Sequence, residues 1–194
     1  IYVNDSIKHI EIVKDLTKDN FKFFCDCYYC IRTWTIKRKI YGSKYGYLNG
    51  ISWLYLTLNL FLKDNFKNKK IFVKEFFNFY INYDWNIPIN INNLIIEKKS
   101  HSDKIVYISS LTINSSNIVR NITPNSWNTI LEELKISYEI CKNNDMNLLY
   151  NSKSLNKNLI KITINDQFYF NRVEKKNKIS SEIWKLNIKN HIEP

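Results

Sequence analysis

The sequence predicts a mainly helical domain over residues 1–150, followed by the beginning of a smaller α+β domain over residues 151–194. Before residue 143, apolar side chains recur at three- and four-residue intervals in several stretches, which is the pattern of helices with one buried face. Near residue 150 this pattern gives way to a β-branched run and then to another helical stretch. With 44% hydrophobic and 15% aromatic residues, the chain can bury a sizeable core.

The first predicted helix runs from Asp19 or Asn20 to about Ile40. Its buried face is expected to hold Phe23, Phe24, Cys27, Cys30, Ile31 and Trp34. The helix ends in three cations, residues 37–39, which suit the negative end of a helix dipole but also suit phosphate groups. Both interpretations of that basic cluster stay open at this point.

All three glycines of the chain, Gly42, Gly46 and Gly50, fall within nine residues. Glycine is favoured where the backbone takes positive φ or comes close to something, so we expect a close approach to another helix or to a ligand here. The apolar run Ile51–Leu62 follows and is shorter than the ~20 residues that a membrane span needs. We expect it to be the central buried helix.

Two more helices are predicted in the first domain. One spans about Lys70–Tyr83, with its aromatic side chains on one side, and the other begins at Pro124 and runs to about Lys142. Between them, residues 89–122 predict an irregular connection with at most one short strand, around residues 104–108. In the second domain we expect a strand at Leu159–Ile164 and a helix from about Ser180.

The net charge of +11 and the pI near 9.4 indicate a polyanionic partner, either a nucleic acid or a nucleotide. The alternative is codon bias: a chain with no alanine and many Lys, Asn and Ile residues is typical of an A+T-rich genome. The four cysteines lack the spacing of a secreted disulfide framework and no signal segment precedes them, so we expect a reducing compartment. Because the chain opens at Ile1 rather than Met, we also expect it to be a slice of a longer protein.

No catalytic and no metal-binding residue is assigned from the sequence. Cys25, Cys27 and Cys30 have close spacing, but on a helix their side chains do not converge, and the three histidines are scattered. Gly42-Ser43 is similar to the Gly-Ser turn that begins a nucleotidyltransferase active site, yet the next acidic residue is Asp64, beyond the whole apolar helix.

Several motifs in order along the chain carry a family resemblance. Ile31–Tyr41 has a basic-x-Trp pair and an Ile-Tyr ending, and Gly46–Trp53 reads Gly-Tyr-Leu-Asn-Gly-Ile-Ser-Trp. Further matches are Phe76–Tyr80 with Trp85–Ile89, Ser115–Val119 ahead of Glu132-Glu133-Leu134, and Trp184–Pro194. Together they resemble the central domain of eukaryotic and viral poly(A) polymerases and the first helix of their C-terminal RNA-binding domain. Departures from the family pattern, such as Asn49 in place of a glycine, suggest a divergent viral or protist member.

The resemblance implies a three-domain transferase in which ATP lies between an upstream nucleotidyltransferase domain and this helical domain. It places the triphosphate near Arg32, Lys37 and Tyr41 and the adenine against the Gly50–Ile51 step, with Ser43 where the family commonly has an Asn. Arg32 stands where the family has a lysine, so the charge is kept but a bidentate fork replaces a compact ammonium. The alternatives are packing roles for Tyr41, Gly50 and Ile51 and a solvated face for the two cations.

The function implied is template-independent addition of AMP from ATP to RNA 3′ ends during mRNA processing. Mg²⁺ or Mn²⁺ would be bound by three aspartates of the upstream domain, and an RNA-recognition-like fold would begin after residue 150. The expected partners are ATP, an RNA 3′ end and either polyadenylation-complex proteins or a second copy of the chain, but no membrane. The expected location is the nucleus for a cellular protein and the cytoplasm or a viral factory for a viral one. The alternative function is a non-catalytic basic RNA-binding protein or subunit, for example a ribosome-associated one.

Overall fold

The computed structural model describes residues 2–91, 105–112 and 116–151, with side chains from residue 7 onward. In chain order the elements are α1 (Tyr2–Thr17), η1 (Lys18–Asn20), α2 (Phe21–Lys37), η2 (Ser43–Tyr45), α3 (Gly50–Phe61), α4 (Lys69–Ile81), α5 (Pro124–Lys142) and α6 (Met146–Leu149). All of them belong to the first of two units into which the chain divides, Ile1–Lys153. The predicted mainly helical character is confirmed for this part of the chain.

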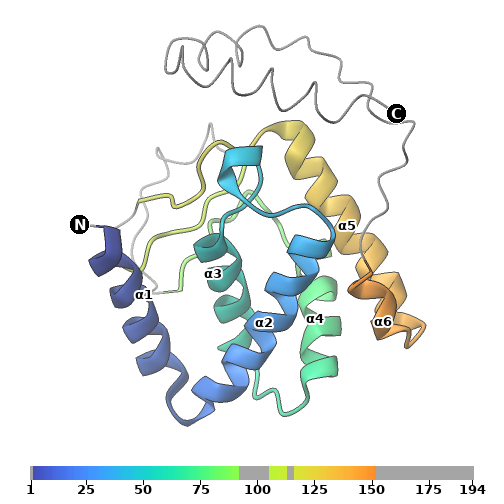
Figure 1. The fold of residues 1–194 in the computed structure, drawn as a ribbon, viewed down its shortest axis with the longest axis horizontal. Helices are drawn as coiled ribbons and strands as arrows, with labels where there is room; N and C mark the ends of the chain where they lie inside the picture. The colour runs from blue at the N-terminus through green and yellow to red at the C-terminus, as the bar shows by residue number, and fades with distance from the viewer. Residues whose placement is uncertain (1, 92–104, 113–115, 152–194) are drawn as a thin grey trace, which may run out of the picture. The chain divides into compact units, whose positions relative to one another are not determined.

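The central position predicted for the apolar helix is confirmed by α3. Eight of its twelve residues are buried, and it packs against α2 and α4 (Figure 1). An aromatic cluster joins these three helices. The Trp34 ring of α2 meets Trp53 of α3 edge-on at 5.7 Å between centroids and Phe77 of α4 at 4.8 Å. Burying apolar surface stabilises a fold by about 25 cal/mol per Å², so the large rings of this cluster contribute strongly to the stability of this region.

The predicted helix from residue 19 or 20 to about 40 is α2, and it ends earlier than expected, at Lys37. The physical reason is the backbone of Lys39, whose φ of 60° takes it out of the helical region. The amide of Ile40 then donates to the carbonyl of Thr35 at 3.0 Å, which closes the helix end.

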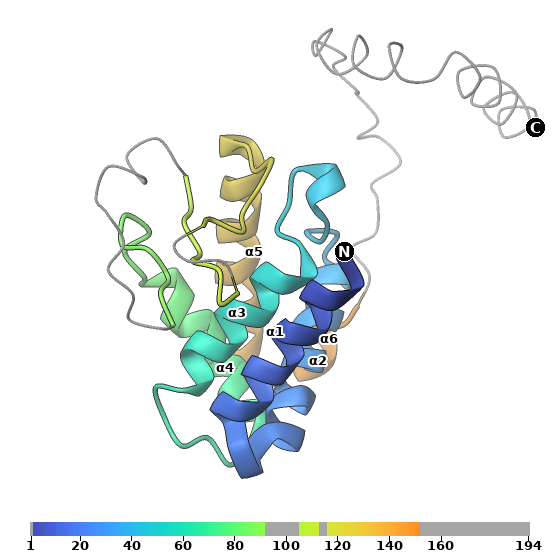
Figure 2. The ribbon, with the colours of Figure 1, turned by 90° about the vertical axis from the view of Figure 1, so that its left-hand side faces the viewer.

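Helix α1 was not predicted, and this is a correction to the expectation that the first element begins at residue 19 or 20. Its buried positions are His9, Val13 and Thr17, spaced four apart, of which only Val13 is apolar. The apolar residues Ile7 and Ile10 are instead 48% and 55% exposed. Figure 2 shows α1 beside α3, and a polar contact anchors it there: His9 Nδ1 lies 2.5 Å from the Tyr55 hydroxyl of α3. The apolar residues of α1 therefore do not mark its buried face.

The described residues between α4 and α5, up to 91, 105–112 and from 116, form no helix and no regular strand, as predicted for them. They form two isolated β-bridges, Ile89 with Ile108 and Ser109 with Asn117, instead of the short strand that was allowed for. The Asn117 side chain organises this region. Its Oδ1 accepts from the amides of Ile108 (3.1 Å) and Val119 (3.0 Å), and its Nδ2 donates to the carbonyl of Val106 at 3.0 Å. One amide side chain thus supplies backbone partners that a β-ladder would otherwise provide.

Helix α5 begins at Pro124, as predicted, and its start is a reciprocal cap. The Thr123 hydroxyl accepts from the Ser126 amide at 3.2 Å, and the Ser126 hydroxyl accepts from the Thr123 amide at 3.0 Å. Further along, Ser137 accepts a hydrogen bond from the indole N–H of Trp34 at 2.7 Å, which fixes α5 against α2.

The predicted strand at residues 159–164 and the last helix from about residue 180 lie outside the described residues, so they stay predictions, as does the domain boundary near residue 150. Within the described ranges, no helix combines the length and the apolarity that crossing a membrane requires.

Candidate functional site

The turn between α2 and α3 is shaped by two glycines, at either end of η2. Gly42 and Gly46 have φ angles of 108° and 76°, a region that side chains with a Cβ strongly disfavour. The amide of Gly42 donates to the carbonyl of Leu48 at 2.9 Å, and the carbonyl of Gly46 accepts from the Ser126 hydroxyl at 2.6 Å. The turn is therefore closed on itself and fixed to the start of α5, beside which it lies in Figure 1.

Helix α3 begins immediately after this turn, and Asn49 is its N-cap. The Asn49 Oδ1 accepts from both the amide and the hydroxyl of Ser52, at 2.8 and 2.9 Å. Asn49 itself is extended, with a φ of −83° and a ψ of 176°. The replacement of the family's glycine at this position therefore costs no backbone strain and supplies a cap.

Three of the six predicted ATP-binding residues are brought together: Arg32, Tyr41 and Gly50. The guanidinium carbon of Arg32 lies 5.9 Å from the centroid of the Tyr41 ring. The Tyr41 hydroxyl lies 2.6 Å from the position that a Cβ on residue 50 would take, which is closer than two unbonded heavy atoms of this kind can approach. Gly50 is thus the close backbone approach that the glycine cluster predicts, and Tyr41 is the group that approaches it.

A fourth residue of this cluster, Tyr28, was not singled out from the sequence. Its hydroxyl donates to the carbonyl of Gly50 at 3.0 Å. The pKa of Tyr28 is raised to about 12, first by burial and then by the neighbouring Tyr41, while Arg32 acts in the opposite direction. The pKa of the Arg32 guanidinium is itself raised, first by hydrogen bonding with Tyr41. The signal available in the sequence was spacing, since Tyr28 precedes Arg32 by four residues and so shares its face of α2.

The other three predicted residues lie around this cluster rather than in it. Lys37 is exposed in the last turn of α2, Ser43 is half-buried at the start of η2, and Ile51 is partly buried against the core. Among the interactions of the described residues, no hydrogen bond, ion pair or ring contact joins Lys37 or Ser43 to Arg32, Tyr41 or Gly50.

The basic cluster at the end of α2 divides into two kinds of cation. Arg38 turns inward: its Nε lies 3.8 Å from the carboxylate of Glu133 on α5, and its Nη2 donates to the carbonyl of Leu148 on α6 at 3.0 Å. Lys37 and Lys39 are exposed. Of the two interpretations left open for this cluster, a structural role therefore holds for Arg38, and only the two lysines are accessible to a phosphate group.

Among the described residues, no group of three His, Cys, Asp or Glu side chains could hold a metal ion. The close-spaced cysteines point apart along α2, as their helical spacing requires: Cys25 is exposed and Cys27 is buried. Burial raises the pKa of the Cys27 thiol to about 12, with smaller contributions from Cys30 and Asp26, so this thiol stays protonated at neutral pH.

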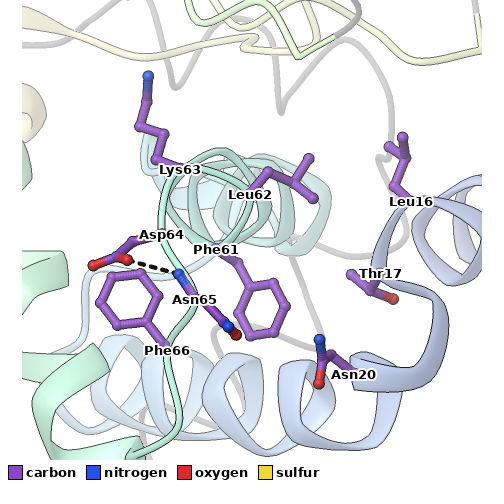
Figure 3. A pocket seen from close by; sticks show the side chains of 9 residues that line it. All are labelled: Leu16, Thr17, Asn20, Phe61, Leu62, Lys63, Asp64, Asn65 and Phe66. Carbon is purple, nitrogen blue, oxygen red and sulfur yellow. Dashed lines mark hydrogen bonds between the residues drawn. The ribbon is translucent and has the colours of Figure 1, made fainter.

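A pocket of about 410 Å³ lies at the other end of α3, between the α1–α2 turn and the start of the α3–α4 connection (Figure 3). Its lining consists of Leu16, Thr17, Asn20, Phe61, Leu62, Lys63, Asp64, Asn65 and Phe66. None of the predicted ATP-binding residues is among them, because the length of α3, roughly 16 Å at 1.5 Å per residue, separates Gly50 from Phe61. The pocket and the Arg32–Tyr41–Gly50 cluster are therefore separate features.

Comparison with known proteins agrees with the resemblance drawn from the motifs. The family described as "Poly(A) polymerase central domain" matches residues 23–157, a range that contains all six predicted ATP-binding residues. A poly(A) polymerase from Entamoeba histolytica is 32% identical over 114 residues, which cover 57% of this chain and 21% of that protein. The chain thus spans about a fifth of the length of this curated relative. Because the family matches well over half of the sequence, the chain belongs to the poly(A) polymerase central domain family.

Proposed function

We propose that this chain is the part of a poly(A) polymerase that positions ATP for addition of AMP to the 3′ end of an RNA. The observation that supports this most directly is the Arg32–Tyr41–Gly50 cluster. It joins an exposed guanidinium, a phenolic hydroxyl and a closely approached backbone at the start of the central helix. The structural alternative, in which Arg32 is simply a solvated cation, does not explain its contact with Tyr41.

Arg32 and Tyr41 have the chemistry that a triphosphate requires. A guanidinium is always charged at neutral pH and presents several donors in a planar fork that suits phosphate oxygens. The Tyr41 ring beside it restricts the positions that the guanidinium can take, so less rotamer freedom remains to be lost on binding. In the proposal, Arg32 contacts the phosphates, Tyr41 orients Arg32 and adds a hydroxyl donor, and Lys37 supplies a second charge.

The remaining predicted residues have simpler roles in this proposal. Gly50 leaves room for the Tyr41 hydroxyl, and the partly buried Ile51 offers an apolar surface to the adenine. Ser43 offers a hydroxyl at the entrance of the turn. Phosphoryl transfer depends on positioning and charge neutralisation, and these residues contribute only positioning. The described residues do not fit the family's divalent metal, so no step of the reaction is assigned to them.

Titration of the 194-residue chain with ATP tests the proposal. We expect Arg32→Ala to weaken ATP binding by roughly 10- to 150-fold, the effect of losing one charge-assisted contact. Lys70→Ala, which removes an exposed lysine from the first turn of α4, is the matched control and should leave ATP affinity unchanged. In a polypeptide that also carries a nucleotidyltransferase domain, Arg32→Ala and Tyr41→Phe should lower kcat/KM for AMP incorporation.

The same experiment separates the proposal from its alternative. If the chain binds RNA but its ATP affinity is the same in Arg32→Ala, Tyr41→Phe and Lys70→Ala, then the Arg32–Tyr41–Gly50 cluster is a packing feature. A non-catalytic RNA-binding role would then be the better description.

A further inference from the structure

The η2 turn exposes an aromatic ring that the fold does not need. Tyr45 is 70% exposed, the largest exposed fraction among the large hydrophobic side chains of the described residues. Because so little of its surface is removed from water, the ring adds little to the stability of the domain. One edge of the ring lies near Gly42, since a Cβ on that residue would be 3.4 Å from Tyr45 Cδ2.

The backbone under Tyr45 is held by contacts that do not involve its ring. The amides of Tyr45 and Tyr47 both donate to the carbonyl of Gly42, at 3.0 and 3.2 Å. The carbonyl of Gly46 accepts from the Ser126 hydroxyl at 2.6 Å, which ties the turn to α5. The ring is therefore presented on a pre-organised turn, so a ligand that stacks on it would not have to order the loop.

A lysine lies beside this ring, an arginine follows on the neighbouring segment, and acidic residues are absent from this part of the sequence. The Lys44 ammonium lies 5.9 Å from the centroid of the Tyr45 ring. Across the turn, the exposed Arg120 directly precedes Asn121, whose carbonyl oxygen lies 3.5 Å from the position of a Cβ on Gly46. No Asp or Glu occurs between Asp26 and Asp64. We call Lys44, Tyr45 and Arg120 the Tyr45 surface.

We propose that the Tyr45 surface binds single-stranded RNA, with a base stacked on the Tyr45 ring and the neighbouring phosphates contacted by Lys44 and Arg120. The inference extends the proposed function, because it names a surface for the RNA rather than for ATP. An exposed ring among cations is the combination by which proteins hold single strands, since every base has a π-face and every nucleotide carries a phosphate. A protein partner would instead require acidic groups to match these cations.

The test is equilibrium binding of two end-labelled oligomers to the 194-residue chain, followed by fluorescence anisotropy in the absence of ATP. One oligomer is single-stranded oligoadenylate, and the other is an abasic strand of the same length, which keeps the phosphates but has no bases. We expect Tyr45→Ala to weaken oligoadenylate binding by roughly 5- to 100-fold and to leave binding of the abasic strand unchanged. Tyr45→Phe, which keeps the ring, should bind oligoadenylate as the parent chain does.

The charge contribution is tested with a matched pair of lysines. Lys44→Ala should weaken binding of both oligomers and reduce the slope of log affinity against log salt by about 1, as expected when one phosphate contact is lost. Lys70→Ala removes the same charge from the first turn of α4, outside the Tyr45 surface, and should change neither affinity. Circular dichroism melting of Tyr45→Ala should match that of the parent chain, because the ring is exposed.

Two results would overturn the inference: an oligoadenylate affinity that Tyr45→Ala does not change, or equal losses for the oligoadenylate and the abasic strand. ATP is absent from this assay, and Arg32 lies outside the Tyr45 surface. A failed ATP titration with Arg32→Ala would therefore refute the proposed ATP site without affecting this result, and the converse also holds.

Discussion

The contact between residue 50 and the Tyr41 hydroxyl predicts a strong coupling between two substitutions. In Gly50→Ala, the new Cβ would lie 2.6 Å from Tyr41 Oη, so either the side chain or the helix start must move. The next nearest atoms, Tyr28 Oη at 3.6 Å and Tyr41 Cζ at 3.7 Å, are at ordinary contact distance. Removing a single oxygen atom with Tyr41→Phe should therefore remove the clash.

The magnitudes follow from two opposing effects. Inserting a methyl group into an occupied space costs about 1–3 kcal/mol, whereas replacing glycine by alanine in a helix gains about 0.5–1 kcal/mol. In the parent chain, Gly50→Ala should therefore lower the free energy of unfolding by up to about 2.5 kcal/mol. In the Tyr41→Phe background, the same change should be neutral or stabilising by up to about 1 kcal/mol, so the coupling energy is about 1–3 kcal/mol.

The assay is urea unfolding of the four chains of this cycle, followed by circular dichroism. A second cycle with Tyr28→Phe is the matched control, because the Tyr28 hydroxyl lies 3.6 Å from the Cβ position and should not clash. Additive effects of Gly50→Ala and Tyr41→Phe, within about 0.5 kcal/mol, would show that the close approach at residue 50 is not what requires glycine there.

Three further predictions concern the surrounding structure and are measured as urea midpoints. Arg38→Met should lower the free energy of unfolding by about 3 kcal/mol, because it removes the cation beside the Glu133 carboxylate, whose side chain is 2% exposed. A change below about 1 kcal/mol would contradict a structural role for this pair. Asn117→Ala should cost about 2–4 kcal/mol through its three hydrogen bonds to backbone, and an unchanged midpoint would refute that role. The pKa of Tyr28 is raised from 10.0 to about 12, mainly by burial. The stability that the protonated Tyr28 hydroxyl contributes to the folded state is therefore complete below pH 10 and is lost as pH rises toward 12. Tyr28→Phe should therefore reduce the loss of stability over that interval, and an identical pH profile would count against a buried, protonated hydroxyl.

Much of the helical framework could be predicted from the sequence, because periodicity reports burial wherever the buried residues are apolar. The buried face of α2 follows the predicted stripe, with Phe24, Cys27, Ile31 and Trp34 buried. The glycine cluster also predicted an unusual backbone, and two of its residues have positive φ. Helix α1 could not be predicted from apolar periodicity, because two of its three buried side chains are polar and form hydrogen bonds instead of apolar contacts.

The sequence by itself determined the helices α2 to α5, the place of the glycine turn and the family that the motifs resemble. Only the tertiary structure decided how neighbouring cations differ: Arg38 reaches α5 and α6, while Lys37 and Lys39 stay exposed. It also decided that Tyr28 meets Gly50, a residue 22 positions later in the chain. The physical reason is that periodicity specifies the direction of a side chain around its own helix, whereas the partner it meets depends on how separate helices pack against one another.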